Sequence, residues 1–345
     1  MPRIEIGAPE ASGIPADDRG PIVNDLHSQL NETRVARIVQ PASVDHLAAL
    51  VAGARREQRA IAIAGGRHAM GGQQFAEGAV LIDTRRLNRV LEFDRDNGTL
   101  TVEGGAQWPD IIGYLSAHQP SGQVDAGAKQ WGIVQKQTGA DRLSIGGALA
   151  CNAHGRGLAL KPLVDQVRWF DLTDADGMVR RCSRTNHPEL FRLVIGGYGL
   201  FGVVTRVQLQ LRSRVRVRRV VELAETASII DRFEARIRAG YLYGDYQFTT
   251  DAGRDSFLRR GIFSTYQPVA DDTPLTVQPT RFHPADWARL TLYAHRYKRR
   301  AFEVYSRRYL ATSGQVYWAD SQLSAAYVDH YPAHVDRALG ARVKG

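Results

Sequence analysis

The chain has 345 residues, of which 43% are hydrophobic and 23% are charged, and its formal net charge at pH 7 is +9. These proportions are ordinary for a globular protein, and the length leaves room for two domains or for one domain with a cap. No apolar run approaches the roughly 20 residues that span a bilayer, and two cysteines, Cys151 and Cys182, provide neither a disulfide framework nor a metal cluster. We therefore expect a cytoplasmic protein without a signal peptide, whose contact with membranes is at most peripheral.

The first 30 residues are rich in proline, glycine and aspartate, which predicts a flexible N-terminal arm over residues 1–30. Hydrophobic periodicity and turn signals then predict short elements between glycine loops. They are a helix at 43–56, strands at 61–64 and 79–83, a hairpin of 90–94 with 99–103, a helix at 108–118, a hairpin of 167–172 with 178–182, a helix at 188–194 and a strand at 201–211. The pattern indicates the α+β class. It lacks the regular βαβ rhythm and the glycine fingerprint typical of a nicotinamide dehydrogenase.

The composition changes near residue 213, where we place a domain boundary. Arginine alternates with valine between Arg212 and Arg219, which predicts a strand with a solvated arginine face. A charged helix is predicted at 222–238, and aromatic strands follow it, with Tyr246 and Tyr266 as core or pocket-wall residues. Because the other basic residues are scattered, with no zinc spacing and no helix-turn-helix pattern, we do not expect a nucleic-acid partner.

Three glycine-rich loops, at 65–72, 138–157 and 196–202, are the most informative feature of the chain. Glycine lets backbone N–H groups approach a ligand closely, and successive backbone donors bind phosphate. Two of the loops also carry an imidazole, His68 in the first and His154 in the second. Together the loops indicate a large, flat ligand that carries phosphates, and a flavin dinucleotide fits this description.

Other reactive residues near these loops have simpler interpretations. We expect Cys151 to be a small buried hydrophobic residue. We expect Lys129 and Lys136 to be solvated, and Asp141 and Arg142 to form an ion pair that holds the second loop.

At these loops the chain resembles FAD-linked oxidases that share the FAD-binding domain of vanillyl-alcohol oxidase and p-cresol methylhydroxylase. Residues 65–73 (GGRHAMGGQ) resemble the Gly-x-x-His-Ser loop of cytokinin dehydrogenases and aldonolactone oxidases. Residues 144–156 (SIGGALACNAHGR) and 196–202 (GGYGLFG) resemble segments of alditol oxidases and of decaprenylphosphoryl-ribose oxidase. The resemblance implies a two-subdomain FAD-binding domain of the p-cresol methylhydroxylase type at 31–213, followed by a partial α+β substrate (cap) domain at 214–345.

The resemblance also implies the site residues. In many members of the family the histidine of the first loop bonds covalently to the 8α-methyl group of the flavin, which would be His68 here, although Ala69 stands where the family usually has serine. His154 and Arg156 correspond to residues that face the substrate, and they are the predicted catalytic residues. The predicted FAD-binding residues are Gly65, Gly66, Arg67, His68, Ala69, Met70, Gly71, Gly72, Gln73, Thr138, Gly139, Asp141, Ser144, Gly146, Gly147, Asn152, Gly199, Gly202, Val203 and Val204.

The activity that the resemblance implies is oxidation of a hydroxyl group. A small sugar, polyol or sugar-lactone-like substrate would give a hydride to N5 of the flavin, and molecular oxygen or another acceptor would take up the electrons. Two alternatives remain open at this point: a flavin-dependent reductase of a C=C bond, similar to sterol-24 reductases, and a non-catalytic, shortened flavin-binding protein. The oligomeric state is also left open.

Overall fold

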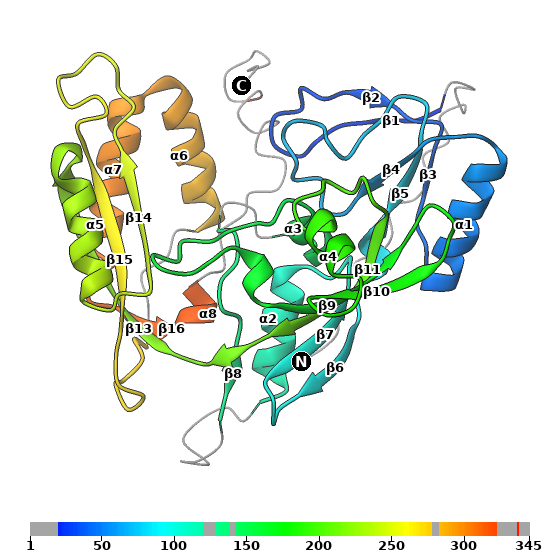
Figure 1. Ribbon diagram of the computed structural model, residues 1–345. Coiled ribbons are helices and arrows are strands. Elements are labelled where there is room, and N and C mark those ends of the chain that lie inside the picture. Colours follow the sequence, from blue (N-terminus) through cyan, green and yellow to red (C-terminus); the bar gives the residue numbers. More distant parts are fainter. Residues whose placement is uncertain (1–19, 120–128, 139–141, 278–282, 323–336, 338–345) are drawn as a thin grey trace, which may run out of the picture.

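The structure is a computed structural model that describes residues 20–119, 129–138, 142–277, 283–322 and 337, and these residues form two lobes (Figure 1). The first lobe contains β1 to β12 with α1 to α4, and the second contains β13 to β16 with α5 to α7. The mixture of helices and sheets confirms the predicted α+β class. Within the described residues, no helix is both long enough and apolar enough to cross a membrane.

The first part of the first lobe is a small parallel sheet with the strand order β3-β5-β4. Ser43 caps the helix that covers the sheet, because its side chain accepts a hydrogen bond from the N–H of His46. Leu47 of this helix packs against Ile82 in the central strand. The elements are β1 (Ile22–Val23), β2 (Thr33–Arg34), β3 (Arg37–Val39), α1 (Val44–Arg56), β4 (Ile61–Ala64) and β5 (Val80–Asp83).

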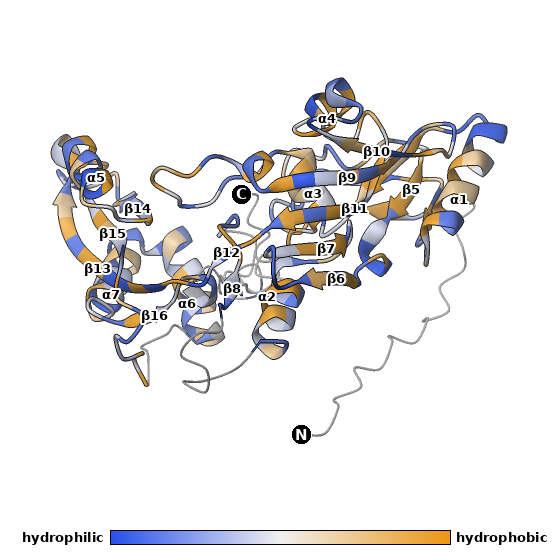
Figure 2. Ribbon diagram, turned by 60° about the horizontal axis from the view of Figure 1, so that its bottom comes forward, coloured by the Kyte–Doolittle hydropathy of each residue, from blue (hydrophilic) through white to orange (hydrophobic). Residues whose placement is uncertain are grey.

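The second part of the first lobe is an antiparallel sheet with the order β10-β9-β11-β7-β6. Hydrophobic residues run along β7 and β11 in Figure 2, and the fully buried Leu100, Phe170 and Val207 lie in the main core that these strands form. The elements are β6 (Val90–Asp94), β7 (Thr99–Glu103), α2 (Trp108–Ala117), β8 (Trp131–Gly132), α3 (Ile145–Ala150), β9 (Val167–Thr173), β10 (Val179–Ser183), α4 (Pro188–Val194), β11 (Val203–Gln210) and β12 (Arg212–Ser213).

The second lobe is a four-stranded antiparallel sheet with the order β14-β15-β13-β16. Phe263 on one face packs against Phe233 of α5, and Ile262 on the other face packs with Tyr309 of α7, so helices cover both faces. The elements are β13 (Arg216–Glu225), α5 (Ile229–Arg238), β14 (Tyr243–Phe248), β15 (Arg260–Pro268), α6 (Pro284–Arg296), α7 (Lys298–Leu310), β16 (Val316–Trp318) and α8 (Ala319–Gln322).

Most elements predicted up to residue 211 are found within two residues of their expected bounds, but one prediction beyond residue 213 is wrong. The helix predicted at 222–238 begins only at Ile229, because residues 222–225 continue β13 and pair with β15. Among the alternating arginines, Arg218 is exposed. Arg219 breaks the alternation and lies on the opposite face of β13, with the buried Val217 and Val221. It is 8% exposed, its Nε donates to Oγ of Ser264 at 3.1 Å, and its guanidinium lies over the ring of Tyr309.

Part of the segment predicted as a flexible arm is folded. Residues 1–19 lie outside the described residues, but residues 20–30 belong to the folded lobe. Val23 is buried in a small cluster with Val35, and β1 pairs with β2. This segment therefore contributes to the surface beside the first glycine loop.

The junction between β7, β11 and α3 yields a stability prediction. Gly104 follows β7, and a Cβ at this position would overlap the carbonyl oxygen of Val204. Since backbone rather than a movable side chain fills this space, we expect Gly104→Ala to lower the free energy of unfolding by about 2–3 kcal/mol.

The matched control is Gly113→Ala on the exposed side of α2, where a Cβ would meet nothing within 4 Å. Alanine favours a helix interior over glycine, so this variant should be more stable by about 0.5–1 kcal/mol. Urea unfolding of both variants makes the comparison, and equal effects would show that the junction is not tightly packed.

Candidate functional site

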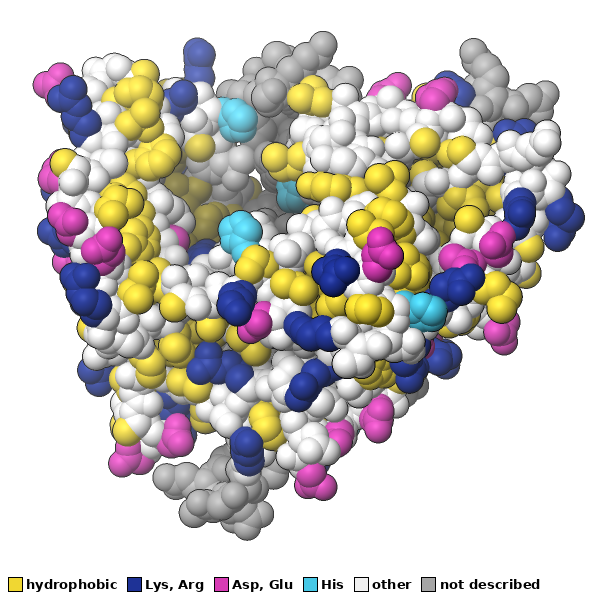
Figure 3. Space-filling view, viewed as in Figure 1, with side chains coloured by type: hydrophobic (Ala, Val, Ile, Leu, Met, Phe, Trp, Pro, Cys, Tyr) yellow, Lys and Arg dark blue, Asp and Glu magenta, His cyan; other side chains and the backbone are white. Residues whose placement is uncertain are grey.

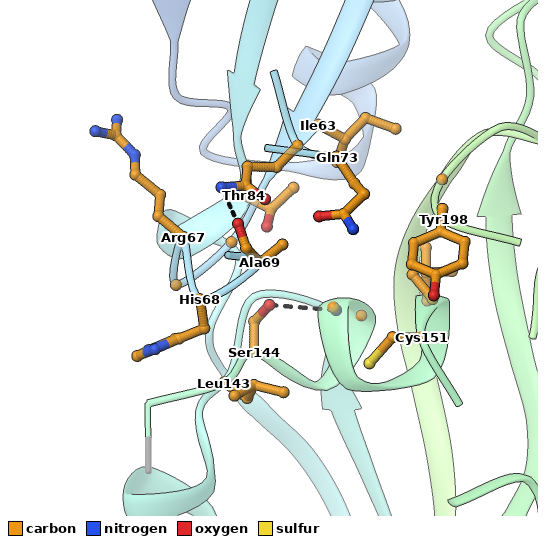
Figure 4. Close-up of a pocket in the computed structure, with 18 of the residues that line it drawn as sticks. Ile63, Arg67, His68, Ala69, Gln73, Thr84, Leu143, Ser144, Cys151 and Tyr198 are labelled. Atoms are coloured by element: carbon orange, nitrogen blue, oxygen red, sulfur yellow. Dashed lines mark hydrogen bonds between the residues drawn. The ribbon is translucent and has the colours of Figure 1, made fainter. Parts of the chain in front are cut away.

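A cleft of about 700 Å³ opens between three segments of the first lobe. This volume lies within the range of roughly 300–1,000 Å³ that is typical of ligand pockets. Its walls are the loop after β4, the start of α3 and the loop between α4 and β11. The face of the molecule in Figure 3 is hollowed between the lobes, and its lysine and arginine side chains are spread over the surface rather than gathered in one patch. Figure 4 shows the side chains that these segments bring to the cleft.

The loop after β4 offers a row of backbone donors. The N–H groups of Gly66, Arg67, Ala69, Met70 and Gly71 donate to no other residue that the structure describes. All five residues line the cleft. All five residues are half-buried or exposed, so these N–H groups are accessible to a ligand that accepts hydrogen bonds, such as a phosphate.

The side chain of Arg67 points away from the cleft in Figure 4. It lies near the buried carboxylate of Asp83, with Nη2 at 3.8 Å from Oδ2. Arg67 therefore contributes its backbone rather than its charge to the cleft, and its φ of +56° helps to turn the loop.

The second wall begins at Ser144, which is the N-cap of α3. Its buried hydroxyl accepts a hydrogen bond from the N–H of Gly147 at 3.3 Å. A Cβ on Gly65 would overlap Oγ of Ser144, so only glycine allows the first loop to approach the helix this closely. Gly146 and Gly147 leave the first turn of α3 without side chains, which keeps this wall flat.

The third wall is a tight turn between α4 and β11. Four residues of the turn have positive φ angles, +81° at Gly196, +52° at Tyr198, +79° at Gly199 and +137° at Gly202. The N–H of Tyr198 donates to the carbonyl of Ala150 at 2.9 Å, which ties the turn to the end of α3. In Figure 4, Tyr198 and His68 lie on opposite sides of the cleft.

The structure brings most of the predicted FAD-binding residues together along this cleft. Those that line it are Gly65, Gly66, Arg67, His68, Ala69, Met70, Gly71, Gln73, Ser144, Gly146, Gly147, Gly199, Gly202, Val203 and Val204. Gly72, Thr138 and Asn152 are not among the lining residues. The amide oxygen of Asn152 accepts from the N–H of Val164, which is a structural role. Gly139 and Asp141, with the predicted Asp141–Arg142 ion pair, lie outside the described residues.

The two predicted catalytic residues lie away from the lining of the cleft, at the junction of the lobes. Nη1 of Arg156 is 3.1 Å from Oδ1 of Asp245 in β14, and its Nε donates to the hydroxyl of Thr138 at 2.8 Å. Next to Thr138 along the chain, Gln137 lines the cleft, so Arg156 is linked to the cleft through this segment. His154 is exposed, and its Nδ1 lies 3.1 Å from the carbonyl oxygen of Gly155.

Two predictions about neighbouring residues are wrong. Cys151 lines the cleft and is exposed rather than buried, because α3 ends at Ala150 and its last turn faces the open space. Lys136 is 2% exposed rather than solvated, and its Nζ donates to the carbonyl of Gln137 at 3.3 Å.

The most informative lining residue that the sequence analysis missed is His27. Its Nε2 lies 2.9 Å from Nδ1 of His68, although the two residues come from different segments. The sequence does indicate an ordered turn around His27, because residues 24–31 (NDLHSQLN) contain the Asn, Asp and Ser side chains that are typical of such turns.

The residues present fit FAD. A dinucleotide needs hydrogen-bond donors for its pyrophosphate and flat, mainly apolar walls for its rings. The backbone donors of the first loop, which pair with no residue that the structure describes, can bind the pyrophosphate, and the glycines of α3 with Val203 and Val204 provide flat walls for the rings.

Comparison with known proteins agrees with this geometry. Residues 35–183 match the family described as "FAD binding domain". The chain is 28% identical to L-gulonolactone oxidase of Mus musculus over 172 residues, which are 50% of this chain and 36% of the relative. It is 28% identical over 200 residues to L-galactono-1,4-lactone dehydrogenase 2, mitochondrial, of Oryza sativa, which are 56% and 32% of the two chains.

A third relative is L-gulono-1,4-lactone dehydrogenase of Mycobacterium tuberculosis, 30% identical over 196 residues, or 57% of this chain and 43% of the relative. The chain therefore spans less than half of the length of each of these three relatives.

Cys151 allows a chemical test of what fills the cleft. Partial burial raises the pKa of its thiol above the usual value, so little thiolate forms at neutral pH, and alkylation by iodoacetamide should be slow and should accelerate as the pH rises. Because Cys151 lines the cleft, we expect bound FAD to slow its alkylation further, as measured by mass spectrometry of the cysteine peptides.

Cys182 is the internal control. It is fully buried, and burial raises its pKa to about 11, so it should stay unmodified with or without FAD. Equal alkylation of Cys151 in the FAD-loaded and FAD-free protein would place the cofactor outside this cleft.

Proposed function

We propose that the chain oxidises a hydroxyl group of a sugar-lactone-like substrate with the help of FAD, because residues 35–183 match the FAD binding domain family and the chain is similar to lactone oxidases and dehydrogenases. The observation that carries this proposal is the cleft in which the first glycine loop, whose backbone donors pair with no described residue, faces the glycine-rich start of α3. We infer the substrate class from the names of the relatives and the cofactor from the geometry of the cleft.

The first glycine loop and the start of α3 would hold the pyrophosphate, and the turn at 198–204 would border the flavin rings. When bound, FAD supplies an acceptor at N5 for the hydride of the substrate's C–H bond. The electron acceptor that follows is molecular oxygen or another small molecule. His68, in the wall of the cleft, would carry the covalent bond to the cofactor.

Arg156 and His154 would act on the substrate from the junction of the lobes. A guanidinium stays charged at all relevant pH values, so Arg156 cannot serve as a base, but its planar donors can orient a hydroxyl or carbonyl oxygen. Asp245 and Thr138 already hold the guanidinium in one orientation. The exposed imidazole of His154 can take up the proton of the hydroxyl group as the C–H bond breaks.

Anaerobic mixing with lactones tests the activity. We expect L-gulono-1,4-lactone or L-galactono-1,4-lactone to bleach the visible absorption of the bound flavin. Arg156→Lys keeps the charge but loses the planar fork, so it should lower the bleaching rate constant about tenfold, which corresponds to about 1.4 kcal/mol.

Arg218→Lys is the matched control, because Arg218 is exposed on β13 and should tolerate the change. Bleaching by NADPH but by no lactone, sugar or polyol would contradict the proposal and would favour the C=C reductase.

Acid denaturation tests the bond to His68. If the flavin is covalent, the yellow colour stays with the precipitated polypeptide, and His68→Ala releases it to the supernatant. His295→Ala, which removes an exposed histidine of α6, should leave the colour in the pellet. Colour in the supernatant of the unaltered protein would refute covalent attachment but not FAD binding.

A further inference from the structure

Residues 24–31, called the His27 turn below, form a compact hydrogen-bonded segment around a buried carboxylate. Asp25 is 2% exposed. Its carboxylate accepts hydrogen bonds from the N–H groups of His27 and Ser28, at 2.9 Å and 2.6 Å, and from the side-chain amide of Asn31 at 2.8 Å. These bonds fix the backbone of the turn and therefore the direction in which the side chain of His27 leaves it.

The His27 turn is attached to the first glycine loop on both sides of His68. The N–H of Leu26 donates to the carbonyl of Arg67 at 3.1 Å. The amide of Asn31 donates to the carbonyl of Met70 at 2.6 Å. These two hydrogen bonds flank His68 and Ala69 and hold this part of the loop against the turn.

The two histidine rings meet between these attachments. Nε2 of His27 and Nδ1 of His68 are 2.9 Å apart, with ring centroids at 5.0 Å and an interplanar angle of 46°. A contact of this length requires one nitrogen to donate and the other to accept, so it couples the tautomers of the two rings and restricts the orientation of His68.

We propose that His27 is a positioning residue for the covalent attachment of FAD, which holds the ring of His68 in place and takes up its proton as the bond forms. This inference rests on the proposed bond between His68 and the cofactor. In the tautomer with hydrogen on Nδ1 of His68, Nε2 of His27 accepts that hydrogen, and the new bond to the flavin forms at Nε2 of His68.

The overall change is balanced when oxygen is the oxidant. The attachment forms one N–C bond between His68 and the 8α-carbon of the flavin, and it removes one hydrogen from the imidazole and one from the methyl group. Molecular oxygen takes up both hydrogens with their electrons as hydrogen peroxide. The role of His27 is to receive the imidazole proton during this change and to release it to solvent.

The environment of His27 suits a proton acceptor. Burial lowers its pKa below the usual value, although the nearby Asp25 acts in the opposite direction. A histidine with a lowered pKa is neutral at pH 7, so its ring nitrogen is available to accept a proton.

The experiment follows attachment over time in the full-length chain, prepared as apoprotein from riboflavin-depleted cells and mixed with FAD. Samples are precipitated with acid, and the flavin retained by the polypeptide is measured. We expect His27→Ala to slow attachment about 100-fold. His27→Gln, which keeps a hydrogen-bonding group but no base, should be intermediate, and added imidazole should restore part of the rate of His27→Ala.

Two further measurements separate positioning from folding. The affinity for FAD before attachment, from quenching of flavin fluorescence, and the melting temperature should be unchanged in His27→Gln. His295→Gln, an exposed histidine on α6, should attach FAD at the rate of the unaltered protein.

Attachment at the unaltered rate in His27→Ala would overturn the inference and leave the proposed function intact. Slow attachment that imidazole does not restore and that parallels weaker FAD binding would also overturn it. Release of all flavin from the unaltered protein by acid would refute both the bond to His68 and the role of His27, whereas oxidation of lactones is judged separately by anaerobic bleaching.

Discussion

The cleft depends on places where backbone and side chain approach so closely that no Cβ fits. A Cβ on Gly66 would overlap the carbonyl oxygen of Arg142, and one on Gly146 would lie 3.0 Å from the carbonyl oxygen of Gly104. Gly104 in turn lies against the carbonyl of Val204. These approaches join the parallel sheet, α3 and the antiparallel sheet in one continuous chain. The same glycines that allow this packing leave backbone donors facing the space between them, so packing and ligand binding have a common origin.

The features that could be predicted from the sequence are those encoded locally. The helix capped by Ser43 and the hairpin around Asn97-Gly98 each rest on a signal of a few residues, and both are present. The glycine loops likewise predicted most of the lining of the cleft, because runs of glycine are typical of tight turns and of close backbone approach.

Features that depend on distant partners could not be predicted in this way. Arg219 belongs to a charged run in the sequence, but in the structure it lies on the buried face of β13, where the rings of Tyr266 and Tyr309 cover it. Lys136 resembles a solvated lysine for the same reason. His27 lies 41 positions before His68, and only the fold brings the two rings together. Arg156 belongs to a motif of the first lobe, yet its carboxylate partner, Asp245, comes from the second.

The segment that carries Arg156 also limits how the lobes can move. Gly157 forms a bridge with Tyr243, the N–H of Gly244 donates to the carbonyl of Arg156 at 2.9 Å, and the N–H of Leu158 donates to the carbonyl of Leu242 at 3.0 Å. The edge of the second sheet is thus continued by backbone from the first lobe. A hinge motion that separated the lobes would have to break these main-chain hydrogen bonds in sequence, as when a β-ladder is unzipped. Entry and exit of small molecules must therefore rely on local rearrangement of loops and side chains, with the two lobes retained as one mechanical unit.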